Sequence, residues 1–217
     1  MLGRYREGIR VSAPFAVAVV AFGVSFGVLA RTAGMGAVAP IVFSATTWGG
    51  SAQFAAAAIL GSGGAVASAI AAALLLNSRY LAMSAAIAPS LTGGALRRAL
   101  HGVAVVDESW ALSARGDGTF DRDKLIGVAL TLYPAWLAGT AIGAIGGDAI
   151  GDPEALGLDA AFPALFLALM VTQLRSRQHV AAALLGGAIA TLLIPFTPAG
   201  VPIIAASVAA LVGVRGR

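Results

Sequence analysis

Residues 32–78 read TAGMGAVAPIVFSATTWGGSAQFAAAAILGSGGAVASAIAAALLLNS, and none of these 47 residues carries a charge. The stretch is too long for one membrane-spanning helix, which needs about 20 apolar residues, and it is too apolar for a soluble domain. Its polar residues are clustered, chiefly around Gly49-Gly50-Ser51 and Asn77-Ser78. We therefore interpret it as membrane segments that hold a buried polar site inside the bilayer.

The composition of the whole chain also indicates that it is surrounded mostly by lipid. Hydrophobic residues make up 59% of the chain and charged residues 11%, against about 25% charged in soluble domains. Helices satisfy their own backbone hydrogen bonds in lipid, and the apolar runs do not alternate in polarity as β-barrel strands do. We predict an all-α polytopic transmembrane helix bundle of about 6–8 membrane segments, forming a single domain over residues 1–217. The candidate spans are 11–30, 38–60, 64–90, 125–147, 160–174, 179–195 and 199–214.

The distribution of basic residues predicts the orientation of the bundle. Arginines and lysines lie at segment ends, in the N-terminal residues, in 115–124, in 175–178 and at the C-terminus, whereas the 148–159 loop holds only acids. Cytoplasmic loops carry the excess of cations, so both termini are expected in the cytoplasm, and the net charge of +4 needs no nucleic-acid partner. The first apolar segment has no clear cleavage site, so we expect it to remain as a helix.

Arg97 and Arg98 do not fit this orientation without a further assumption. They lie outside if 64–90 crosses the membrane once, and inside if 64–90 folds back at Asn77–Tyr80 as two half-helices. We favour a broken or re-entrant 64–90.

Matching residue spacings suggest an internal duplication. The first pair of matching triplets is Pro14, Gly23, Gly27 and Pro134, Gly143, Gly147; the second is Gly34, Pro40, Phe43 and Gly157, Pro163, Phe166. We predict repeat halves at 8–91 and 125–214, joined by 92–124. Repeats with broken helices often form a substrate site near the midplane of transporters, but the sequence leaves open whether these repeats are parallel or inverted.

The first candidate site is formed by Gly49, Gly50, Ser51 and Gln53, with Ser44 before them in the same segment. Each glycine weakens a helix by roughly 1 kcal/mol relative to alanine, and an unwound turn frees backbone groups that can hold an amino or carboxylate group. The alternative is close helix packing through small residues, which explains the glycines and serine better than it explains Gln53.

Charged residues in apolar surroundings form two further candidates. A charge near the bilayer centre costs about 3 kcal/mol, so Arg79, next to Asn77, should bind a carboxylate, pair with Asp107 or Glu108, or reach the headgroups. Asp107 and Glu108 are candidates for proton coupling, or belong to a short interfacial helix. Because adjacent helical residues point about 100° apart, these two acids are not expected to form one metal clamp.

The sequence gives no support for an enzyme. Gly23-Val24-Ser25-Phe26-Gly27 matches the nucleophile-elbow pattern, but it lies inside a predicted span and not at a strand-to-helix turn. Zinc-protease and P-loop patterns are absent from the sequence, and His101 and His179 have no ligand-like spacing. We predict a protein that is not an enzyme and that has no metal or cofactor.

Three segments in order resemble the AzlC-type permeases, the large subunit of two-component branched-chain amino acid exporters. They are Trp48-Gly49-Gly50-Ser51-Ala52-Gln53-Phe54, Asn77-Ser78-Arg79-Tyr80-Leu81-Ala82-Met83-Ser84 and Asp107-Glu108-Ser109-Trp110-Ala111-Leu112. The resemblance implies a secondary transporter subunit in the inner membrane that exports hydrophobic amino acids, with a small AzlD-type membrane partner. A passive channel or a structural subunit of a membrane complex remains the alternative.

Overall fold

The computed structural model describes residues 2–115, 117–150, 167, 170–171, 174, 176–197 and 201–210. This part of the chain is helical, and its one extended contact is an isolated antiparallel bridge between Ala114 and Phe120. Among the described residues, three helical stretches are long and apolar enough to cross a membrane, namely Arg6–Met35, Val66–Ser90 and Arg122–Gly147. The all-α membrane bundle is therefore confirmed.

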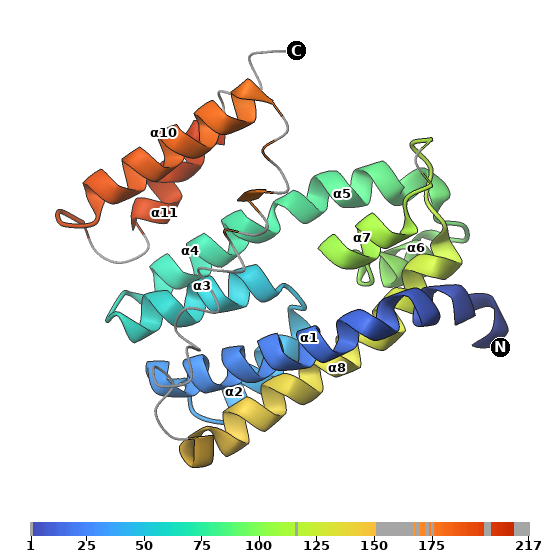
Figure 1. Ribbon diagram of the computed structural model, residues 1–217, viewed down its shortest axis with the longest axis horizontal. Coiled ribbons are helices and arrows are strands. Elements are labelled where there is room, and N and C mark those ends of the chain that lie inside the picture. The colour runs from blue at the N-terminus through green and yellow to red at the C-terminus, as the bar shows by residue number, and fades with distance from the viewer. Residues whose placement is uncertain are drawn as a thin grey trace.

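Two long helices, α1 (Arg6–Ala30) and α8 (Arg122–Ile150), lie side by side and run in the same direction (Figure 1). Glycines bring their backbones into contact. A Cβ atom on Gly27 would lie 2.4 Å from the carbonyl oxygen of Thr140, and one on Gly143 would lie 2.1 Å from that of Val24. No larger residue fits these positions without moving a backbone, so the glycines of the sequence pattern here serve helix packing.

The segment predicted as one span at 38–60 is a re-entrant hairpin, and the single-span prediction is wrong. It consists of α2 (Val38–Thr46) and α3 (Gly50–Gly61). A straight helix would separate residues 33 and 61 by about 42 Å, yet a Cβ atom on Gly61 would lie 3.4 Å from that of Ala33. The chain reverses at residues 47–49, where Gly49 has φ −148° and ψ 82° and ends the helical path.

The next segment contradicts the expected fold-back at Asn77–Tyr80. Helices α4 (Val66–Asn77) and α5 (Arg79–Ile87) follow one another along nearly one line, and the 3₁₀ turn Ala88–Ser90 completes the stretch (Figure 1). Ser78 interrupts the stretch. Its amide donates to Leu75 O at 3.2 Å, and Leu81 donates to Ser78 O at 3.1 Å, three residues apart in each case. The helix is thus broken at Ser78, but it is not re-entrant, because Ser78 itself keeps helical backbone angles, with φ −58° and ψ −25°.

The hairpin thus lies at 38–61 and not at 64–90, and this change removes the difficulty with Arg97 and Arg98. Their helix, α6 (Ala95–Gly102), lies at the same end of the molecule as the N-terminus (Figure 1). Arg122 at the start of α8 donates to Thr92 Oγ1 at 2.5 Å, and Lys124 pairs with Glu7 at 3.1 Å. The basic residues up to Lys124 therefore gather at one end of the bundle, apart from Arg31 and Arg79. The orientation of that end in the cell stays a prediction.

The remaining helices are short or belong to the second half. They are the 3₁₀ turn Leu2–Tyr5, the π-helical turn Arg31–Met35 after α1, α7 (Asp107–Ser113), α10 (Arg177–Leu193), α11 (Val201–Ala206) and the 3₁₀ turn Ser207–Ala210. Helix α7 is too short to cross a membrane. The proposed repeat partners at 157–166, and most of the candidate span 160–174, lie outside the described residues. The duplication and the number of spans stay predictions; if the duplication is real, the shared direction of α1 and α8 makes the repeat a parallel one.

Candidate functional site

A cavity of about 160 Å³ lies where the tip of the α2–α3 hairpin meets the break at Ser78. Helices α1 and α8 form one wall, and the first turns of α3, α5 and α7 form the other. Aromatic and aliphatic side chains line most of it, while its polar groups come from the hairpin tip and from the N-terminal turns of α5 and α7. The lining residues are Phe15, Ala18, Val19, Phe22, Trp48, Gly50, Ser51, Arg79, Tyr80, Val106, Asp107, Glu108, Leu132 and Trp136.

Arg79 is the centre of the polar end of this cavity. Its Nη2 atom donates to Asp107 Oδ2 at 2.6 Å and to Ser51 Oγ at 2.7 Å, and it lies 3.5 Å from the hydroxyl of Tyr80. The side chains of Arg79 and Asp107 are 34% and 36% exposed, so the ion pair is open to the cavity. Of the sequence-based alternatives for Arg79, the structure shows the pairing with Asp107.

The elements that present these groups each begin at the cavity. Ser51 lies in the first turn of α3, after the hairpin reversal, and Arg79 begins α5 directly after the break. Asp107 begins α7, whose first turn is fixed by Ser109: the Ser109 hydroxyl accepts from the Val106 amide at 3.0 Å and donates to Ala104 O at 2.6 Å. Three helix starts therefore converge on one small volume, and helix starts carry unpaired amide donors.

Glu108 also lines the cavity, next to Asp107. It is exposed, whereas the following residue, Ser109, is fully buried. The two neighbouring acids therefore have different surroundings, since Asp107 pairs with Arg79. Within the described ranges, no group of three or more metal-ligand side chains occurs.

Ser44 and Gln53 do not line the cavity. Both are fully buried behind it, where Gln53 Nε2 donates to Ser44 Oγ at 2.8 Å and Trp136 Nε1 donates to the same oxygen at 3.1 Å. The hydroxyl of Thr140 completes this group at 2.9 Å from Ser44 Oγ. The group joins the two arms of the hairpin to each other and to α8, so it holds the hairpin in place.

Gly49 and Asn77 are close to each other but outside the lining. A Cβ atom on Gly49 would lie 2.7 Å from Asn77 Oδ1, so a larger residue at this position would require the Asn77 side chain to move. Asn77 Oδ1 and Arg79 Nε are buried and have no hydrogen-bond partner among the described residues. Buried polar atoms usually find a partner, so these two atoms are exceptions within the described residues.

Sequence reasoning missed two residues of the site, Tyr80 and Trp136. Tyr80 donates to Asp107 Oδ2 at 3.4 Å, and its ring lies under the Arg79 guanidinium at 5.2 Å. The ring of Trp136 packs against Phe26 and Phe54 and also faces the cavity beside Gly50. The position of Tyr80 directly after Arg79 was a usable signal, whereas that of Trp136 carried none.

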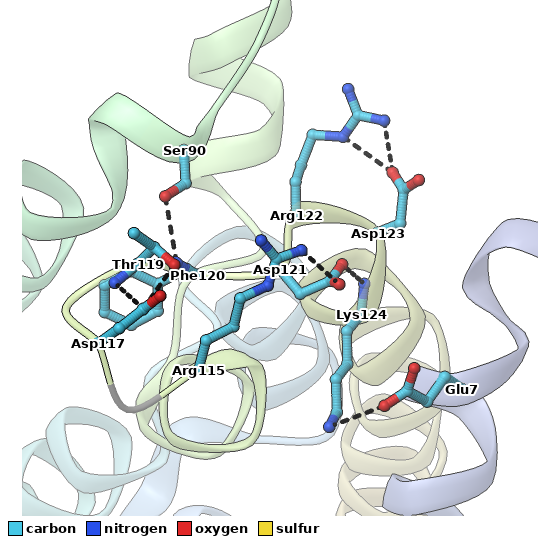
Figure 2. A network of polar contacts seen from close by, with 10 residues as sticks. All are labelled: Glu7, Ser90, Arg115, Asp117, Thr119, Phe120, Asp121, Arg122, Asp123 and Lys124. Atoms are coloured by element: carbon cyan, nitrogen blue, oxygen red, sulfur yellow. Dashed lines mark hydrogen bonds and ion pairs between the residues drawn. The ribbon is translucent and has the colours of Figure 1, made fainter.

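A second polar cluster lies at the basic end, in the loop that leads into α8 (Figure 2). Asp121 accepts from the Lys124 amide at 3.0 Å and from Arg115 at 2.9 Å, and these two interactions lower the pKa of its carboxyl. The hydroxyl and amide of Thr119 lower the pKa of Asp117 in the same way. These pairs close the 113–121 turn and fix the start of α8, so we assign them a structural role.

The AzlC protein family model matches residues 14–150, which is more than half of the chain. The chain belongs to the AzlC family. An uncharacterized membrane protein of Archaeoglobus fulgidus is 34% identical over 208 residues, 94% of this chain and 91% of the relative. No solved structure gives a significant match.

Two further relatives of the chain carry more specific names. The inner membrane protein YgaZ of Escherichia coli is 27% identical over 84% of this chain and 79% of its own length. The branched-chain amino acid transport protein AzlC of Bacillus subtilis is 25% identical over 88% of this chain and 76% of its own length.

The family match covers the segments that form the cavity. All three segments that carried the sequence resemblance contribute to it, through Ser51 and its neighbours, through Arg79 and Tyr80, and through Asp107 and Glu108. Segments separated by about 30 residues each in the chain thus meet at one site in this AzlC family member.

Proposed function

We propose that the protein is a secondary transporter subunit that exports branched-chain amino acids across the inner membrane. One observation carries the proposal: a cavity with a guanidinium at one end and an aromatic and aliphatic wall elsewhere complements a zwitterion with an apolar side chain. The name of the Bacillus subtilis relative, a branched-chain amino acid transport protein, supports this substrate class.

Binding would proceed by exchange of carboxylates on Arg79. The substrate carboxylate takes the place of Asp107 beside the guanidinium, and the Ser51 hydroxyl and the amides at the start of α3 add donors, because helix starts favour anions. Asp107 then becomes free to accept from the substrate ammonium group. The apolar side chain of the substrate lies against Phe22, Leu132 and Trp136.

The charges that line the cavity support coupling to protons. One guanidinium faces two carboxylates, so the ionised site carries one excess negative charge, and a zwitterion does not change that sum. Net charge is unfavourable in an apolar membrane site. A proton on Glu108 would restore neutrality while the empty site returns from the outside to the inside, and its release inside would couple proton entry to substrate exit.

Leucine exchange in vesicles tests the proposal. The protein is reconstituted with the small membrane subunit that we propose as its AzlD-type partner, and labelled leucine is followed with and without an excess of unlabelled leucine inside. A transporter shows saturable flux and counterflow, whereas a passive channel shows neither. If pH-driven leucine efflux survives Asp107→Asn and Glu108→Gln, singly and together, the coupling role is wrong.

The proposed cytoplasmic position of the N-terminus is supported by the basic end of the bundle, and that of the C-terminus rests on its arginines in the sequence. A structural subunit without its own substrate site is the remaining alternative. Arg79→Ala that assembles with its partner yet abolishes transport would argue against that alternative.

A further inference from the structure

Helix α6 is exposed along most of its length. Every residue from Thr92 to Leu100 is exposed. Leu96, Leu100 and Val103 are 76%, 64% and 69% exposed, and they recur at the spacing of one helix face. Val103 keeps helical backbone angles, so the face continues through it. A water-facing position would leave three large apolar side chains uncovered.

The opposite face of α6 is attached to the protein. Arg98 Nη2 donates to Ala88 O at 3.3 Å, and His101 is partly buried near Arg122. Successive residues turn by about 100°, so Leu96 and Leu100 point away from the attached face. Arg97 lies on the flank between the two faces, with its stem against Gly93.

The position of α6 along the bundle corresponds to the membrane surface. The candidate span Val66–Ser90 has 25 residues and a length of about 37 Å, more than the roughly 30 Å of a hydrocarbon core. Helix α6 begins five residues later, at Ala95. The hydrogen bond from Arg122 to Thr92 Oγ1 holds this connection beside the start of α8, where the basic residues gather.

We propose that α6 is an interfacial helix that binds anionic lipid. Leu96, Leu100 and Val103 enter the boundary between headgroups and acyl chains, and Arg97 contacts the phosphate of an anionic headgroup. The amphipathic pattern of a basic flank beside an apolar face is the one that places short helices in the plane of the membrane surface. This assignment does not depend on what the protein transports.

Depth-dependent quenching tests the position of α6. Because the sequence contains no cysteine, Leu96→Cys gives a single labelling site for an environment-sensitive fluorophore on the full-length protein in vesicles. Leu81→Cys, on the candidate span, is the lipid-facing control, and Ala114→Cys, in the exposed loop, is the water-facing control. We expect shallow brominated lipids to quench the Leu96 label and aqueous iodide to reach it poorly. Leu100→Cys repeats the test if the first variant folds badly.

The lipid preference is tested by placing the bromine on either an anionic or a zwitterionic lipid in otherwise equal vesicles. We expect preferential quenching by the anionic lipid, and a loss of that preference by about five-fold in Arg97→Gln. Iodide access at position 96 equal to that at Ala114→Cys would overturn the proposal. Protection from both quenchers would also overturn it, because a second copy of the chain or another protein would then cover the face.

Discussion

Trp136 donates its indole N–H to Ser44 Oγ at 3.1 Å, across the boundary between α8 and the re-entrant hairpin. The same oxygen accepts from Gln53, so one serine hydroxyl joins both arms of the hairpin to the wall of the cavity. Polar contacts of this kind between membrane helices contribute only about 0.6 kcal/mol on average, but leaving several buried partners unsatisfied costs more.

Ser44→Ala should therefore lower the thermal stability of the purified protein. The substitution leaves Gln53 Nε2 and Trp136 Nε1 without their acceptor, at a cost of about 1–3 kcal/mol. Ser62→Ala, at the outer end of the same hairpin, is the matched control, since Ser62 bonds only to carbonyls of its own helix. Apparent melting temperatures in detergent compare the two, and equal values would show that the Ser44 group does not hold the hairpin.

Gly143→Ala should separate α1 from α8. The new methyl group would lie 2.1 Å from Val24 O, closer than any real contact allows, so one backbone must move. Gly146→Ala on the same helix meets nothing within 4 Å and should be tolerated. The two variants are compared by yield of folded protein and by melting temperature, and similar behaviour would mean that the close contact is not needed.

Arg79→Lys should weaken leucine binding without unfolding the protein. A lysine keeps the charge but loses the planar fork that can hold Ser51 and a carboxylate together. Loss of one hydrogen bond to a charged group corresponds to about 10-fold or more in affinity. Isothermal titration of the purified protein with leucine measures this, with Arg97→Lys as a control outside the cavity.

Acidification should loosen the attachment of α6 through His101. Burial lowers the pKa of His101 below its ordinary value of 6.5, and the charges of Arg122 and Arg97 lower it further, against a smaller opposite effect of Asp123. The unfolded or detached state therefore binds the proton more readily, so the contribution of His101 is complete above about pH 6.5 and declines as the pH falls below it.

A spin label at Leu96→Cys measures this loosening as increased mobility between pH 8 and pH 5. His101→Gln in the same background should remove the pH dependence. An unchanged response in the glutamine variant would assign it to other groups.

The sequence predicted the helical membrane class and the three segments that meet at the cavity, because composition and local residue patterns carry that information. It predicted the fold-back at Asn77–Tyr80, whereas the chain reverses at residues 47–49. Gly49-Gly50 was recognised as a weak point for a helix, but the reversal there is held by Ser44, Gln53 and Trp136, which pair across the fold. Such pairing joins residues up to 92 positions apart, and local spacing does not reveal it.

The polar residues near Asn77 and Arg79 led to the opposite error, a reversal predicted where none occurs. They resembled a second reversal, whereas only Ser78 departs from the regular hydrogen-bond pattern. Arg79 stays within a straight segment because Asp107 and Ser51 supply its partners from other helices. The pairing of Arg79 with Asp107 was among the alternatives that the sequence offered, but its choice over the others required the fold.

The backbone contacts of α1 with α8 also limit how this bundle can change shape. At Gly27 and Gly143 the main chains touch without side chains between them, so neither helix can slide or rotate without breaking dense packing. The two helices therefore behave as one rigid body. Any motion that exposes Arg79 to one side of the membrane and then to the other has to come from the hairpin, from α5 and from α7, which would move relative to α1 and α8.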